Sequence, residues 1–129
     1  MERKSRMSKV LNVIGCILLL VMAIFHGSGY SFIKETIDAS NSEAFLKEIV
    51  PTLFVHPSIH LIGLAAVGVL AIYISEGKRK ILLLLSLLVG LDALLAFNLG
   101  GILPGILLLA AALCFAVASL KKSITANLI

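Results

Sequence analysis

Hydrophobic residues dominate four stretches of the chain, at about residues 10–31, 53–75, 81–98 and 102–120, and polar or Gly/Pro-containing segments separate them. Each stretch has about 17 to 23 residues, enough at about 1.5 Å per residue to cross a hydrocarbon core of ~30 Å. Such segments have to be helical, because unpaired backbone groups are too costly in lipid. The pattern predicts an all-α integral membrane protein with four transmembrane helices in an antiparallel up-down bundle.

Lysine and arginine are distributed unequally between the two sides of this bundle. Nine of the eleven flank one side: Arg3, Lys4, Arg6, Lys9, Lys78, Arg79, Lys80, Lys121 and Lys122. Only Lys34 and Lys47 fall on the other side. The positive-inside rule therefore predicts that both termini are cytoplasmic. The basic start followed by an apolar run is also the pattern of a signal peptide, but we interpret it as the first spanning helix.

The two connections on the outer side differ in character. Residues 31–50 are mildly acidic, and Ser40 with Glu43 has the spacing of a capping box. This predicts a short amphipathic helix in the connection, with Phe45, Leu46 and Ile49 on one face. Residues 98–105 contain Gly101, Pro104 and Gly105 and predict a tight turn, so the third and fourth helices should be neighbours.

Length and composition place the chain in the membrane class. Its 129 residues predict one domain, residues 1–129, and 60% of them are hydrophobic while 14% are charged. A soluble domain is typically about half apolar and a quarter charged. The formal net charge of +4 lies beside the apolar runs, so we expect contact with membrane lipid and no binding of nucleic acid. The expected location is a cell membrane, as a multi-pass protein of the bacterial inner membrane.

Four strongly polar side chains fall within or at the edge of the apolar segments: His26, His56, His60 and Asp92. At about 1.5 Å per residue, His26 lies ~25 Å and His60 ~24 Å from the cytoplasmic edge. Asp92 lies ~18 Å from the same edge, and His56 one helical turn farther out than His60. All four are therefore expected in the outer half of the bundle.

Asp92 is the most unusual of these residues. A carboxylate inside a spanning segment costs about 2.5–3.5 kcal/mol on insertion scales, so it should face the bundle and find a partner. His60 and His26 are the nearest partners by depth, followed by Asn98 and Ser86. The histidines have a plainer explanation, because backbone carbonyls can satisfy an imidazole inside a helical bundle.

These residues are compatible with a metal or haem site. His56 and His60 are spaced to bind one ion from a single helical face, with His26 and Asp92 completing the shell. Imidazole and carboxylate suit several transition metals, so the metal is not specified. A b-type haem would instead lie between His26 and His60. The cofactor therefore stays open between a transition metal ion, a b-type haem and a small ligand.

Two other interpretations remain open. Asp with His inside a membrane is typical of proton relays and small-molecule pockets, and a proton-coupled carrier of this size would have to be a homo-oligomer. Alternatively, the chain is a non-catalytic accessory or scaffold subunit that binds a partner membrane subunit. The sequence contains no recognisable catalytic motif, so it does not decide whether the protein is an enzyme.

Overall fold

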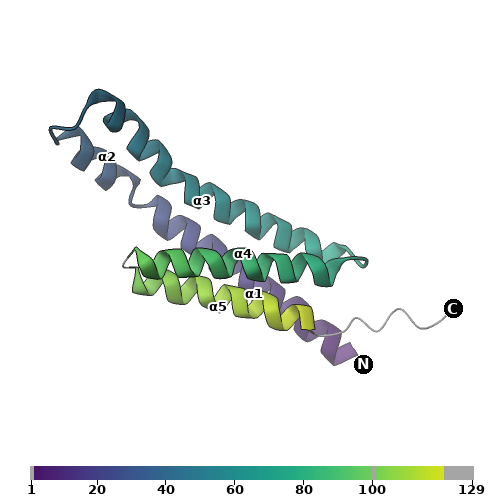
Figure 1. Ribbon diagram of the computed structural model, residues 1–129. Coiled ribbons are helices and arrows are strands. Elements are labelled where there is room, and N and C mark those ends of the chain that lie inside the picture. The colour runs from purple at the N-terminus through teal and green to yellow at the C-terminus, as the bar shows by residue number, and fades with distance from the viewer. Residues whose placement is uncertain (1, 100, 121–129) are drawn as a thin grey trace.

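The structure is a computed structural model that describes residues 2–99 and 101–120. Within these ranges it consists of helices joined by short connections, and no strand occurs. The helices are α1 (Glu2–Gly27), α2 (Tyr30–Asp38), α3 (Ala44–Tyr73), α4 (Lys78–Asn98) and α5 (Ile102–Leu120) (Figure 1). Four helices are long and apolar enough to cross a membrane, as the sequence predicted. Lys121 and Lys122, two of the predicted cytoplasmic residues, lie outside the described ranges.

The helices have two distinct ends. In Figure 1, α1 begins and α5 ends on the same side as the connection between α3 and α4. We call this side the basic end, because Lys9, Lys78, Arg79 and Lys80 lie there. The opposite side, with α2 and the connection between α4 and α5, is the distal end.

The long helices do not pack equally against one another. Contacts are extensive between α4 and α5, between α1 and α3, and between α1 and α5, but α3 packs only loosely against α4. Figure 1 shows the consequence: α3 and α4 lie close together beside their connection and diverge toward the distal end. The molecule is therefore closed near the basic end and splayed at the distal end.

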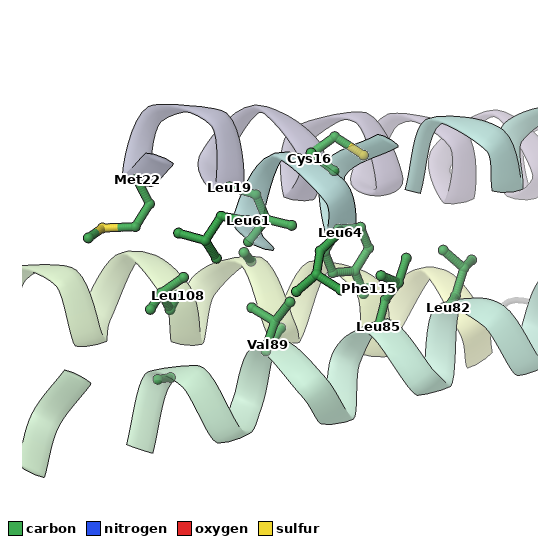
Figure 2. Packing of buried hydrophobic residues seen from close by; sticks show 14 of the residues in the cluster. Cys16, Leu19, Met22, Leu61, Leu64, Leu82, Leu85, Val89, Leu108 and Phe115 are labelled. Carbon is green, nitrogen blue, oxygen red and sulfur yellow. The ribbon is translucent and has the colours of Figure 1, made fainter. Parts of the chain in front are cut away.

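The core lies where the helices approach closely. Phe115 is fully buried among leucines of the other helices (Figure 2). A Cβ atom at Gly15 would lie 2.8 Å from Phe115 Cζ, and one at Gly68 would lie 2.5 Å from Cys16 Sγ. A larger residue at either position would therefore force the neighbouring side chain or the helices to shift. Close packing around small residues is the usual source of helix association in lipid, where apolar burial alone gives no driving force.

Side-chain hydrogen bonds join the helices in the half nearer the basic end. Ser8 Oγ donates to the Ala118 carbonyl at 2.8 Å, which links α1 to α5. Asn12 Nδ2 donates to the Gly68 carbonyl at 2.8 Å, which links α1 to α3. The third bond runs from Ser86 Oγ on α4 to the carbonyl of Ala112 on α5 at 2.9 Å. The polar residues Asn12 and Ser86 are thus satisfied by neighbouring helices.

The predicted capping box is wrong. Ser40 Oγ donates to the Ile37 carbonyl at 2.7 Å, so it closes the preceding helix and does not start the next one. The residue before α3 is Glu43, and its side chain makes no capping hydrogen bond. A short helix does occupy the connection, but it is α2, which ends at Asp38. The predicted helix around Phe45 is instead the start of α3, which continues through Pro51 and Pro57.

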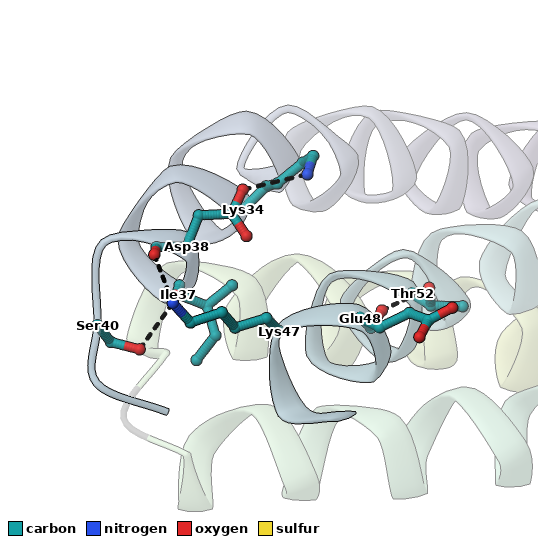
Figure 3. A network of polar contacts seen from close by, with 7 residues as sticks. All are labelled: Lys34, Ile37, Asp38, Ser40, Lys47, Glu48 and Thr52. Carbon is teal, nitrogen blue, oxygen red and sulfur yellow. Dashed lines mark hydrogen bonds and ion pairs between the residues drawn. The ribbon is translucent and has the colours of Figure 1, made fainter. Parts of the chain in front are cut away.

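A polar contact joins α2 to the start of α3 (Figure 3). Lys47 Nζ on α3 donates to the Asp38 carbonyl at the end of α2 at 2.8 Å, and within α2 Lys34 Nζ lies 3.2 Å from Asp38 Oδ2. The 30 residues of α3 extend over ~45 Å, compared with ~30 Å for the hydrocarbon core. Accordingly, α2 and the beginning of α3 extend past the connection between α4 and α5 (Figure 1).

Candidate functional site

A pocket of about 310 Å³ lies between the splayed helices, toward the distal end. Residues of α1, α3, α4 and α5 line it, and most of them are apolar. Its ionisable residues are His26, His60 and Asp92. Three of the four residues that the sequence placed in the outer half of the bundle thus line one cavity.

His60 and Asp92 meet across the pocket. His60 Nε2 lies 3.3 Å from Asp92 Oδ2, which is within ion-pair distance when the imidazole is protonated. Asp92 Oδ2 is buried, yet it has no hydrogen-bond partner among the described residues, because the two groups lack the alignment of a hydrogen bond. The side chain of Asp92 is 24% exposed and that of His60 is 42% exposed. The carboxylate therefore has one loosely held neighbour and capacity to accept a further donor.

The helical repeat places Asp92 at this position. Leu85 and Val89, seven and three residues earlier, are buried on the face of α4 that points into the molecule. Asp92 continues that face toward the distal end. On α3, His60 precedes the buried residue Leu61 by one position, so its imidazole lies at the edge of the buried face. Helical spacing explains why Asp92 points inward while His60 stays partly exposed.

His26 is held by Phe54. His26 Nε2 lies 2.9 Å from the Phe54 carbonyl oxygen, and the two rings stack with their centroids 4.4 Å apart at 22°. A carbonyl oxygen only accepts hydrogen bonds, so this nitrogen carries the proton. Pro57 loosens the same turn of α3, because it lacks the N–H that would bond to the Leu53 carbonyl. His26 thus matches the plainer explanation that the sequence left open, in which a backbone carbonyl satisfies the imidazole.

His56 lies apart from this group. Its side chain is exposed, one turn of α3 nearer the distal end than His60, and it does not line the pocket. Asn98 and Ser86, the more distant partners considered for Asp92, bond instead to the carbonyls of Leu94 and Ala112. His60 is therefore the partner that the structure gives to Asp92.

The described residues give the metal hypothesis no support. They contain no group of three or more His, Cys, Asp or Glu side chains arranged to hold a metal ion. The contacts of the two histidines do not decide the question, because His26 Nε2 faces the Phe54 carbonyl and His60 Nε2 faces Asp92, and the Nδ1 atom of each neutral ring is the nitrogen that could be a ligand. The haem hypothesis, which needs His26 and His60 as paired ligands, stays untested.

Some contributors to the site gave no signal in the sequence. The Phe54 ring and carbonyl fix His26, but an aromatic residue in an apolar run is unremarkable, and Pro57 was the only local hint. Met22 and Leu108 are buried and form the floor of the pocket. Nothing distinguishes them in the sequence from the other apolar residues of their helices.

The function of this site has to be argued from its own geometry. No known protein family, no curated protein and no solved structure matches the chain.

Proposed function

We propose that this protein binds a small, mainly apolar molecule in the pocket near its distal end, with Asp92 and His60 as the polar groups that recognise it. The observation that carries the proposal is the buried Oδ2 of Asp92, which lies in an apolar pocket without a hydrogen-bond partner among the described residues. Ligand pockets typically combine apolar walls with a few convergent polar groups. Their volumes are about 300–1,000 Å³, and this pocket is at the lower end of that range.

The proposal includes a location and an orientation. The chain spans a cell membrane four times as an antiparallel bundle, the bacterial inner membrane being the expected one. Its basic end is cytoplasmic, since Lys9, Lys78, Arg79 and Lys80 gather there. The pocket then lies in the outer half of the bilayer. A buried acid beside an imidazole at that depth is a functional-site candidate, because such residues are rare and costly in lipid.

The pair has a definite chemistry in such a site. An ionised carboxylate is an acceptor for donors of the ligand, and a protonated imidazole is a donor. We assign no reaction to the pair.

The first experiment is native mass spectrometry of the protein extracted with its own lipids. We expect a stoichiometric organic adduct that is lost in Asp92→Asn. The matched control is Asp38→Asn, which removes a carboxylate on the exposed surface of α2. An adduct that persists in Asp92→Asn, or wild-type protein without any adduct, contradicts the proposal.

Elemental analysis of the same samples tests the other hypotheses. Stoichiometric metal that is lost in His60→Ala would favour a metal site. If the protein contains neither metal nor organic adduct and co-purifies with another subunit, an accessory or scaffold role is favoured. If the protein is a homo-oligomer whose proton-dependent transport is abolished by Asp92→Asn, it is a proton-coupled carrier.

A further inference from the structure

We infer that the ligand is a membrane amphiphile with a primary ammonium group, and that it reaches the pocket sideways from the outer leaflet, between α3 and α4. This inference rests on the proposed function and names the class of molecule that the same site accepts.

The path follows from the packing of the helices. α1 contacts both α3 and α5, and α5 contacts α4, so these three interfaces are closed. In contrast, α3 packs only loosely against α4, and the two helices diverge toward the distal end (Figure 1). Met22 on α1 and Leu108 on α5 are buried and close the floor of the pocket. The lining residues beside the gap are exposed, the His60 side chain at 42% and Leu95 at 61%. Phe25 on α1 and Leu99 after α4 are exposed as well, at 51% and 87%. The pocket is therefore closed at its floor, and its exposed lining includes the gap between α3 and α4.

In a membrane, a side opening leads into lipid. α4 has 21 residues, or ~31 Å, which matches the hydrocarbon core, so its exposed leucines face acyl chains. Asp92 lies ~9 Å from the end of α4 at about 1.5 Å per residue. A headgroup at the outer surface thus lies about 9 Å beyond the level of Asp92, so an amphiphile has to sink by about that distance, past Leu95, to bring its headgroup to the carboxylate.

The headgroup follows from the chemistry of Asp92. A buried carboxylate oxygen that makes no hydrogen bond to the described residues can accept one and is best stabilised by a positive charge. His60 supplies that charge only when its imidazole is protonated. In addition, the imidazole is not aligned for a hydrogen bond to Asp92 Oδ2. A primary ammonium group offers a full charge and three donors in any direction. The ligand is therefore expected to be a cation with N–H groups.

The rest of the ligand follows from the walls. The pocket holds about 310 Å³, enough for a headgroup and the first part of a chain. Apart from His26, His60 and Asp92, its lining is apolar or glycine. Leu95 continues this lining onto the surface that faces lipid. A single alkyl chain can thus pass from the pocket into the bilayer without crossing a polar surface.

The test is equilibrium binding of radiolabelled dodecylamine to the full chain in phosphatidylcholine nanodiscs, with empty nanodiscs subtracted. We expect saturable binding of one molecule per chain, weakened at least tenfold by Asp92→Asn and unchanged by Asp38→Asn. Dodecyltrimethylammonium, which has the charge without N–H groups, should compete at least tenfold less well. Propylamine, which has the headgroup without the chain, should not compete.

The path is tested by two substitutions on α4. Leu94 and Leu95 are both 61% exposed, but only Leu95 lines the pocket. We expect Leu95→Trp to slow dodecylamine association several-fold and Leu94→Trp to leave it unchanged. Equal rates in the two variants would overturn access between α3 and α4.

The remaining outcomes are also decisive. Absence of saturable binding, or equal competition by the trimethylammonium compound, overturns the ammonium assignment. Equal competition by propylamine overturns the amphiphile assignment. If a native adduct is lost in Asp92→Asn while dodecylamine does not bind, the pocket is a ligand site of another class, and only this inference fails.

Discussion

His60 Nε2 and Asp92 Oδ2 lie 3.3 Å apart and bring together two helices, α3 and α4, that otherwise pack loosely. Elsewhere α3 is held mainly by α1, through the bonds of Asn12 to Gly68 and of His26 to Phe54. The pair thus serves the site and the fold at once. Its contribution to each can be measured separately.

A double-mutant cycle with His60→Ala and Asp92→Asn should give a favourable coupling free energy. Polar pairs between membrane helices contribute about 0.6 kcal/mol on average and up to ~2 kcal/mol, and the partial exposure of His60 places this pair near the average. Reversible unfolding in SDS provides the measurement. The matched control is Lys34 with Asp38, 3.2 Å apart and about half exposed, which should couple by less than about 0.5 kcal/mol. Equal coupling in both pairs would show that His60 and Asp92 do not hold α3 to α4.

Replacing Gly68 by alanine should destabilise the fold strongly. The new methyl group would lie 2.5 Å from Cys16 Sγ, so the Cys16 side chain or the helices α1 and α3 would have to shift, at a cost of about 1–3 kcal/mol. Gly63 is the control on the same helix, because no atom lies within 4 Å of the corresponding position. Gly63→Ala should leave stability unchanged or raise it slightly, since alanine is the better helix former. Thermal unfolding in detergent measures both, and equal melting temperatures would contradict the close approach of α1 and α3.

Two substitutions of His26 separate its hydrogen bond from its stacking. His26→Phe keeps a ring against Phe54 but removes the donor to its carbonyl, with an expected loss of about 0.5–1 kcal/mol. His26→Ala also removes the stacked ring and should cost about 0.5–1.5 kcal/mol more. SDS unfolding compares the two. As a control, His56→Ala should have little effect, because His56 is exposed. A large effect of His56→Ala would show that the outer turn of α3 packs differently.

Cysteine labelling tests the orientation of the chain. In a background without Cys16 and Cys114, Asn41→Cys at the distal end should react with a membrane-impermeant maleimide on intact cells. Glu76→Cys at the basic end should react only after the membrane is permeabilised. Both positions are exposed, so accessibility in the folded chain does not distinguish them. The opposite pattern would contradict the positive-inside assignment.

Much of the fold could be predicted from the sequence, because length and hydropathy constrain a membrane helix strongly. Four helices were expected and four are found long and apolar enough to span. The exact start of α3 was missed by about nine residues. Residues 44–52 were interpreted as a separate short helix and its connection because Lys47, Glu48 and Pro51 interrupt the apolar run, yet α3 runs through them, and Pro51 costs one backbone bond and is tolerated.

The site was predicted in depth but not in direction. Counting residues along helices placed His26, His60 and Asp92 at similar heights, and all three line one pocket. The sequence does not contain the angle at which each helix faces its neighbours. That angle turns His26 toward Phe54 and His60 toward Asp92, and it leaves His56 exposed. Since a metal shell needs all four side chains to converge, it was the hypothesis most dependent on the missing angle.

The hydrogen bonds of Ser8, Asn12 and Ser86 have a mechanical consequence. They join α1 to α5, α1 to α3 and α4 to α5 in the half of the molecule nearer the basic end. In the distal half, His26 contacts the Phe54 carbonyl between α1 and α3, and His60 contacts Asp92 between α3 and α4, but no side-chain hydrogen bond among the described residues joins α5 to another helix there. Among the described residues, the side-chain hydrogen bonds that join α5 to α1 and α4 are therefore confined to the half nearer the basic end, so a separation of α5 from α1 at the distal end would break neither of them.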